Sequence, residues 1–366
     1  MKKHLKLIVL LFSLSLFLNA PAQKPAFKYA RHTPPPESKH KKNYYSSLYS
    51  SSETEFFVAD KTKKGSVITV YDPHTLETKE TFLLDNPDVE GHKPNWFLHS
   101  FSGDEITTIY SYYDRKEDKN TVYGKITNRN NKVIVEEKAL AKISASKKSD
   151  VGQLSIITSP DKTKFLIFRE PTSRKAPQET IELWLYNDQL EKIYKKKLTF
   201  PYKNKQFSVE QLLVTDSGKV IIIAYYSTSK GEGDPSFKIF GVNEASEELD
   251  EIKIIPKGKS LSSASALLLD SGRSVGFTGF YRDDSRNRGA NGIYYVRINT
   301  NAWEEEVVRF SKVSEEDLQK IMANGSSSER VQKRAKKAVD KDDGIAGLSV
   351  AGCGSRKCGN RDKQDR

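Results

Sequence analysis

The stretch LSIITSPDKTKFLIFR, residues 154–169, decides the fold, because two apolar strands flank a turn that contains Asp161. The same arrangement returns as LLVTDSGKVIIIAY at 212–225 and as LLLDSGRSVGFTGF at 267–280. The turn aspartates Asp161, Asp216 and Asp270 are 55 and 54 residues apart. Asp suits such turns because its side chain bonds the backbone ahead of it, and Gly accepts a positive φ. A strand–turn–strand unit therefore recurs along the chain.

Each of these strand pairs is followed by two more segments with a strand pattern. The third strands are predicted at 181–186, 237–242 and 293–298, and the fourth at 193–198, 251–255 and 305–310. Two weaker copies precede them, with strands at 96–101, 106–113, 122–127 and 133–138, and at 56–59, 67–71 and 78–84. The sequence thus predicts about five four-stranded units between Tyr44 and Val313.

Four-stranded antiparallel units at this period are typical of a β-propeller, since a ring of sheets buries faces that one sheet leaves exposed. The Ser-Pro-Asp-x-x-Lys turn at 159–164 and the Tyr-Asp or Tyr-Asn pairs at 71–72 and 186–187 resemble exported propellers of the TolB and WD40-like type. The resemblance covers residues 44–313 and implies an all-β fold, although no Gly-His or Trp-Asp pair occurs at the positions that define true WD40 repeats. A pair of β-sandwiches is the alternative, and it leaves the repeat unexplained.

The first 22 residues have the three parts of a secretory signal. Lysines at positions 2, 3 and 6 precede an apolar run of 12 residues from Leu7 to Leu18, and the small residues Ala20 and Ala22 suit cleavage after Ala22. A membrane anchor is the alternative, but a helix needs about 20 apolar residues to cross a bilayer. We expect a secreted or periplasmic protein with no transmembrane segment once the signal is removed.

The net charge of +12 suggests nucleic acid until it is located along the chain. Residues 1–49 carry +8 and residues 315–366 carry +3, which leaves +1 for residues 50–314. A nucleic-acid-binding protein concentrates its positive charge on a folded face. We therefore expect no nucleic-acid partner.

The segments outside the repeats have other compositions. Residues 23–43 include Pro34-Pro35-Pro36 and a run of Lys and His, which predicts a disordered lead-in, with an electrostatic tether as the alternative. Residues 314–339 begin with the capping pattern Ser314-Glu-Glu-Asp317 and predict a helical insertion or appendage, followed by an irregular tail at 340–366. We take it as a hypothesis that the reading frame is truncated or shifted near Val350, with blades missing after it.

Motifs that carry catalysis or bind a cofactor are missing from the sequence. The nearest match to a nucleophile elbow, Gly347-Leu-Ser349-Val-Ala351, lacks its second glycine, and no histidine follows it. Phosphate-loop and dinucleotide fingerprints do not occur. We therefore predict no catalytic residues and no cofactor.

Metal-binding spacing is missing as well. All six histidines lie within the first 99 residues, and His92 and His99 flank Trp96 without a ligand at metal-binding spacing. Cys353 and Cys358 suit a small disulfide or free thiols better than a metal site, which would need two more ligands. No metal is predicted.

One candidate binding surface follows from the propeller architecture. The loops between second and third strands open on one rim, and they are predicted at 115–121, 170–180, 227–236 and 283–291. Aromatic and basic residues enter these loops, and such residues give a binding surface large contact area with a polar end. The predicted rim residues are Tyr112, Tyr113, Arg169, Tyr225, Tyr226, Tyr281 and Arg282. The alternative is that alternate members are core residues and the loops are solvent filler.

Three functions fit these observations. The first is an exported, non-catalytic propeller that binds a protein or glycan partner in the cell envelope. The second is a glycan-acting or peptidase-associated hydrolase domain, which would use a carboxylate pair. Candidate carboxylates for it are Asp114, Glu170, Asp234, Asp283 and Asp284. The third is a truncated fragment without function.

Overall fold

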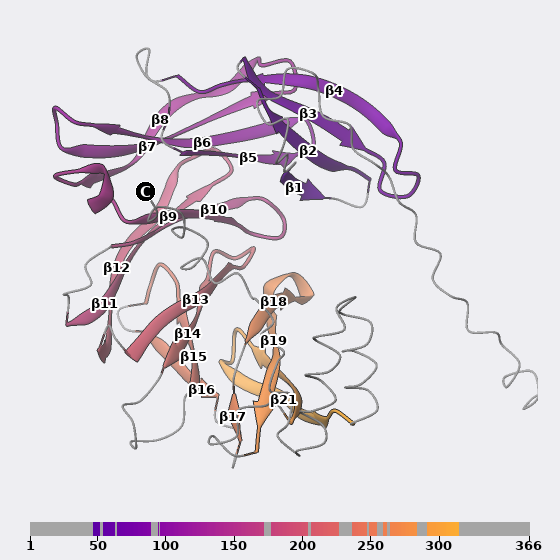
Figure 1. The fold of residues 1–366 in the computed structure, drawn as a ribbon, viewed down its shortest axis with the longest axis vertical. Helices are drawn as coiled ribbons and strands as arrows, with labels where there is room; N and C mark the ends of the chain where they lie inside the picture. Colours follow the sequence, from indigo (N-terminus) through magenta and orange to yellow (C-terminus); the bar gives the residue numbers. More distant parts are fainter. Residues whose placement is uncertain are drawn as a thin grey trace, which may run out of the picture. The chain divides into compact units, whose positions relative to one another are not determined.

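The computed structural model describes residues 47–314, with gaps at 52–53, 63, 89–93, 95, 172–176, 204–205, 227–235, 247–248, 255–258, 262–263 and 284–290. Regular structure in this part of the chain is β-strand, apart from short 3-10 turns such as η1 (Lys148–Asp150) and η3 (Asp270–Gly272). The strands form five antiparallel sheets in which neighbours in sequence are neighbours in space (Figure 1). The predicted all-β fold of about five four-stranded units is confirmed.

The strands are grouped by sheet in chain order. The first sheet contains β1 (Ser47–Ser51), β2 (Phe56–Lys61), β3 (Gly65–Tyr71) and β4 (Thr78–Asp85). The second contains β5 (Trp96–Ser102), β6 (Glu105–Asp114), β7 (Lys119–Asn128) and β8 (Val133–Ser144). The third contains β9 (Gln153–Thr158), β10 (Lys164–Glu170), β11 (Gln178–Asn187) and β12 (Lys192–Lys203). The fourth contains β13 (Phe207–Val214), β14 (Val220–Tyr226), β15 (Ser236–Val242) and β16 (Asp250–Ile254).

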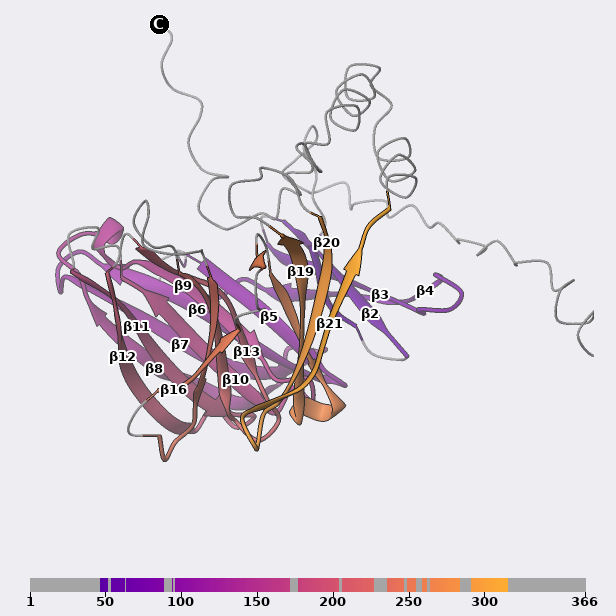
Figure 2. The ribbon, with the colours of Figure 1, turned by 90° about the horizontal axis from the view of Figure 1, so that it is seen from below.

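The fifth sheet departs from the simple four-strand plan. Its first strand is divided into β17 (Ser260–Leu261) and β18 (Ser265–Leu269), both of which pair with β19 (Ser274–Arg282). β20 (Gly292–Asn299) and β21 (Glu304–Lys312) complete it, and Figure 2 shows β19, β20 and β21 side by side. The predicted helical segment and the tail that follow lie outside the described residues, as do the signal and the lead-in.

The chain divides into two compact units at Asn86 and Pro87. The first unit holds the first sheet, and the second unit holds the other four. Closure of all five sheets into one ring stays a prediction.

Within the second unit, β14 of the fourth sheet is buried on both faces over residues 220–224, which are all apolar. Ile222 and its alternate neighbours pack with the third sheet, whereas Ile221 and Ile223 pack with the fifth. These three side chains are at most 1% exposed. Side chains alternate between the two faces of a strand, so an unbroken apolar run is what a sheet between two others requires. A further cluster joins the second sheet to the third, and neighbouring sheets therefore pack in chain order.

The aspartate turns lie side by side in three neighbouring sheets. The backbone N–H of Asp161 in the third sheet donates to Oδ1 of Asp216 in the fourth, at 3.1 Å. Gly272, in the corresponding turn of the fifth sheet, lies so close to Thr215 that an added Cβ would come within 2.9 Å of the Thr215 Cβ. The three repeats found in the sequence therefore meet at equivalent positions.

Among the helices of the described residues, none is long and apolar enough to span a bilayer.

Candidate functional site

The predicted rim residues lie at the ends of β6, β10, β14 and β19. One predicted loop is wrong: β7 begins at Lys119, so residues 115–118 form a tight turn in place of a loop reaching to 121. The turn is short because Asp114 Oδ1 accepts a hydrogen bond from the backbone N–H of Lys116 at 2.7 Å. Much of each of the other three predicted loops lies outside the described residues, namely residues 172–176, 227–235 and 284–290.

Arg169 binds groups of its own chain. Its Nη1 donates to Oε2 of Glu182 at 2.8 Å, and its Nε donates to the carbonyl oxygen of Val151 at 2.6 Å. The side chains of Arg169 and Glu182 are 13% and 18% exposed. A guanidinium can satisfy an ion pair and carbonyls together because its donors form a rigid fork. Arg169 thereby fixes the segment that enters the third sheet.

Tyr113 and Tyr281 are core residues of the sheet stack. Tyr113 is 8% exposed and its hydroxyl donates to the carbonyl oxygen of Ala145 at 3.1 Å. Tyr281 is 3% exposed and meets the ring of Phe310 edge to face, with centroids 5.1 Å apart. Burial leaves both little surface to offer a partner, whereas Tyr112 is half-buried. The binding role of the rim stays a prediction.

Tyr225 and Tyr226 lie on opposite faces of β14 and are both half-buried. Tyr226 packs toward the third sheet, with its ring 4.9 Å from that of Tyr202. Tyr225 packs toward the fifth sheet, beside Phe237 at 5.3 Å. Burial raises the pKa of the Tyr225 phenol, and the positive charge of nearby Arg282 opposes that rise. These residues bring the third, fourth and fifth sheets together at one end of the stack.

A buried lysine lies at the boundary between the third and fourth sheets. The side chain of Lys238 is 7% exposed, and its ammonium binds Glu251 and the hydroxyl of Tyr202. The Tyr202 hydroxyl donates to the other carboxylate oxygen of Glu251 at 2.7 Å, and burial followed by this bond raises the pKa of that phenol well above its usual range. The ammonium also lies 4.3 Å from the Tyr202 ring centroid.

This cluster was not among the predicted site residues. The signal for it is a lysine within the apolar strand FKIFGV at 237–242, because a buried charge requires a partner.

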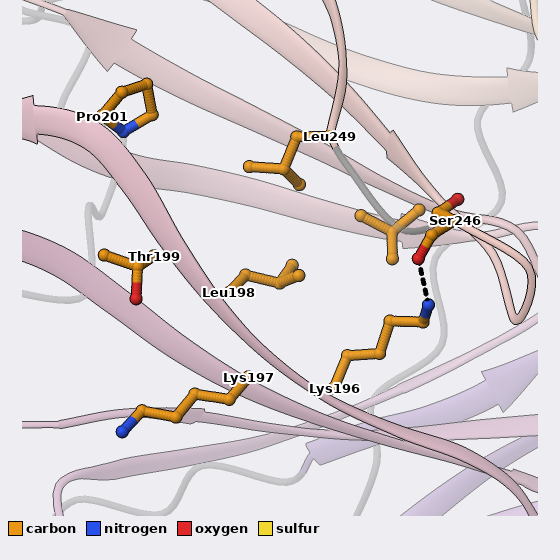
Figure 3. Close-up of a pocket in the computed structure, with 8 residues that line it drawn as sticks. Lys196, Lys197, Leu198, Thr199, Pro201, Ser246 and Leu249 are labelled. Atoms are coloured by element: carbon orange, nitrogen blue, oxygen red, sulfur yellow. Dashed lines mark hydrogen bonds between the residues drawn. The ribbon is translucent and has the colours of Figure 1, made fainter.

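A groove of about 470 Å³ lies along β12. One wall is formed by Val242, Ser246 and Leu249 of the fourth sheet. Figure 3 shows Leu198 and Leu249 on opposite sides of the groove, with Lys196 reaching across to the Ser246 carbonyl. The residues that line it are Lys196, Lys197, Leu198, Thr199, Pro201, Val242, Ser246 and Leu249. Because successive residues of β12 point to opposite faces, a groove that touches four in a row follows the outer edge of the strand.

Two of the predicted hydrolase carboxylates bind groups nearby, and a third, Glu170, ends β10 opposite Gln153 of β9. Asp114 closes its own turn, and Asp283 accepts a hydrogen bond from the Lys259 ammonium at 2.6 Å.

His99 is buried in β5 with its Nδ1 2.9 Å from the Thr108 hydroxyl. Within the described parts of the chain, the His, Cys, Asp and Glu side chains form no group of three that would hold a metal ion. Asp234, Asp284 and both cysteines lie outside these parts.

No protein family matches the sequence, and no curated protein matches it significantly. Among solved structures, a polysaccharide lyase, Uly1, is similar over 79% of this chain and 76% of its own, at 12% identity and a TM-score of 0.39. Prolyl oligopeptidase B from Galerina marginata is similar over 74% of this chain and 35% of its own, at 12% identity and a TM-score of 0.41.

An apocarotenoid oxygenase from Synechocystis is similar over 70% of this chain, at 9% identity and a TM-score of 0.36. The chain spans 58% of the length of that oxygenase. All three neighbours have TM-scores below 0.5, so they assign neither a family nor an activity to this chain.

Proposed function

We propose that this chain is an exported, non-catalytic binding module of the β-propeller type that holds a protein or glycan partner of the cell envelope against its rim. The observation that supports this most is the placement of Tyr225 and Tyr226. They end one strand on opposite faces, so the fourth sheet presents a half-buried aromatic ring at each of its two boundaries. A partner lying across the sheet ends would meet both rings.

Charged groups beside Tyr225 suit such a contact. Arg282 approaches it from the fifth sheet, and the exposed Glu210 lies near it on β13, where Oε1 accepts a hydrogen bond from the Ser208 hydroxyl at 2.6 Å. Aromatic rings flanked by charged groups bind sugar rings and peptide segments because they combine contact area with directional hydrogen bonds.

Tyr226 is held in place by the cluster beneath it. Its ring packs against Tyr202, whose hydroxyl is fixed by Lys238 and Glu251. A ring that is already fixed loses little side-chain entropy when a partner binds, so more of the contact energy appears as affinity.

The test uses the chain without residues 1–22, immobilised and offered an envelope extract and a panel of neutral and acidic glycans. We expect Tyr225→Ala/Arg282→Ala to weaken retention of the bound partner at least about tenfold, the effect expected when aromatic and Arg anchors are removed. The matched control is Lys147→Ala/Arg273→Ala, which alters exposed residues elsewhere. Equal retention by both variants would remove the rim from the proposal, and cleavage of any glycan by the wild type would overturn the non-catalytic role.

A further inference from the structure

We propose that the groove along β12 binds an extended peptide segment of a partner protein, which adds to the third sheet as a further strand. The proposal is independent of the rim and rests on the edge of the sheet. β12 is the last strand in the order β12-β11-β10-β9, and it runs for 12 residues. The outer backbone groups of an edge strand are a template for another strand.

The two faces of β12 differ, and they define the sequence that fits. Leu198 lies on the face toward the fourth sheet, where Val242 and Leu249 line the opposite wall of the groove. Apolar side chains of an added strand would therefore enter the groove from this face.

The other face of β12 is basic. Lys195 and Lys197 are exposed and pair in register with Trp184 and Glu182, which places both lysines on the face toward the second sheet. Lys203 continues this face beyond Thr199 and Pro201, and Figure 3 shows Lys197 pointing away from the groove. Opposite charges directly across two strands stabilise their pairing, and like charges weaken it. The fitting partner is thus a strand that alternates apolar and acidic residues.

The same lysines argue against a second copy of this chain as the occupant. Two β12 strands side by side would place lysines near lysines, which is how natural edge strands avoid pairing with themselves. Pro201 has no N–H, so we expect an added strand to pair with the part of β12 that precedes it.

The probe is a short synthetic peptide of alternating Glu and Leu, measured by fluorescence anisotropy against the chain without residues 1–22. We expect saturable binding that weakens with added salt, because dissolved ions screen the charges of the exposed Lys195 and Lys197. Lys195→Glu/Lys197→Glu should weaken it at least tenfold. Lys142→Glu/Lys148→Glu carries the same charge change on exposed residues of the second sheet and its connection, and should leave binding unchanged. Circular dichroism serves to check that both variants are folded.

Two further peptides test strand addition itself. Methylation of alternate backbone nitrogens removes donors but keeps the charge, and rearrangement of the same residues into a Glu block and a Leu block keeps composition but loses alternation. We expect neither to bind. Binding of either control peptide with the affinity of the alternating peptide would show plain ion exchange and overturn the proposal. Absence of binding by the alternating peptide would overturn it as well. The Tyr225→Ala/Arg282→Ala variant should bind the alternating peptide as the wild type does. The groove proposal and the rim proposal can therefore be overturned independently of each other.

Discussion

At the scale of single residues, Arg169 shows how a side chain that suits a binding surface can belong to the core. Its guanidinium satisfies Glu182 and the carbonyl oxygen of Val151 in a site where both charged side chains are less than a fifth exposed. We expect Arg169→Ala to lower the free energy of unfolding by about 2–3 kcal/mol, because it leaves a partly buried carboxylate without its cation.

Urea unfolding measures this loss, with Lys147→Ala as the control. Lys147 is 72% exposed, and its replacement should cost less than about 0.5 kcal/mol. An Arg169→Ala protein as stable as the wild type would contradict the structural role given to Arg169 and return it to the candidate surface.

Gly272 carries a second residue-scale prediction. Its φ is +84°, a conformation that L-residues rarely adopt, and an added Cβ would meet the Thr215 Cβ of the neighbouring sheet at 2.9 Å. We expect Gly272→Ala to cost about 2–4 kcal/mol, the sum of backbone strain and overpacking. Gly103 has a φ of +57° with open space around it, so Gly103→Ala should cost only the strain, about 1–2 kcal/mol. Equal costs in thermal or urea unfolding would contradict the contact between the two turns.

At the scale of strands and sheets, Tyr186 joins the third sheet to the second. It lies on β11, and its hydroxyl donates to the carbonyl oxygen of Leu140 on β8. Burial raises the pKa of Tyr186 to about 12. The unfolded chain has the ordinary tyrosine pKa near 10, so the stabilisation is full below pH 10 and is lost as the pH rises from about 10 to 12.

Tyr186→Phe removes this titration while keeping the ring. We expect the variant to lose about 1 kcal/mol at pH 8, from the missing hydrogen bond, and to show a shallower decline in stability between pH 10 and 11 than the wild type. Unfolding in urea at pH 8, 10 and 11 gives the comparison. Parallel declines in the two proteins would show that the Tyr186 phenol is accessible to solvent.

The strands were predictable because their signals are local. Alternating or unbroken apolar runs and Asp-Gly turns need no knowledge of the neighbouring sheet, and β10, β14, β15, β19 and β20 lie within a few residues of the predicted ranges. The break between β17 and β18 was not predictable, because the polar residues between them carry no turn signal. Both strands pair with β19, so the break does not change the sheet to which they belong.

The placement of rim side chains was less predictable. Tyr112 and Tyr113 are adjacent in the sequence, so they point to opposite faces and cannot both join one surface. Which of them is buried depends on the neighbouring sheet, and Tyr113 packs with Ile109 against the third sheet. The groove along β12 was not predictable either, because it depends on the distance between the third and fourth sheets, and no local sequence pattern indicates that distance.

At the scale of the whole molecule, the sheets of the second unit follow one another in chain order with equivalent turns side by side. The bond between Asp161 and Asp216 and the contact of Gly272 with Thr215 are the observations behind it. The repeat found in the sequence requires the same order, because each sheet must bury its apolar faces against the next.

The most direct test measures distances between those turns in solution. Spin labels are placed in pairs on Lys162→Cys, Ser217→Cys and Ser271→Cys, in a background where Cys353 and Cys358 are serine, and double electron–electron resonance gives the three separations. We predict that the 162–217 and 217–271 distances are each narrow and shorter than the 162–271 distance. A 162–271 distance equal to or shorter than the other two would contradict the sequential stacking of the third, fourth and fifth sheets.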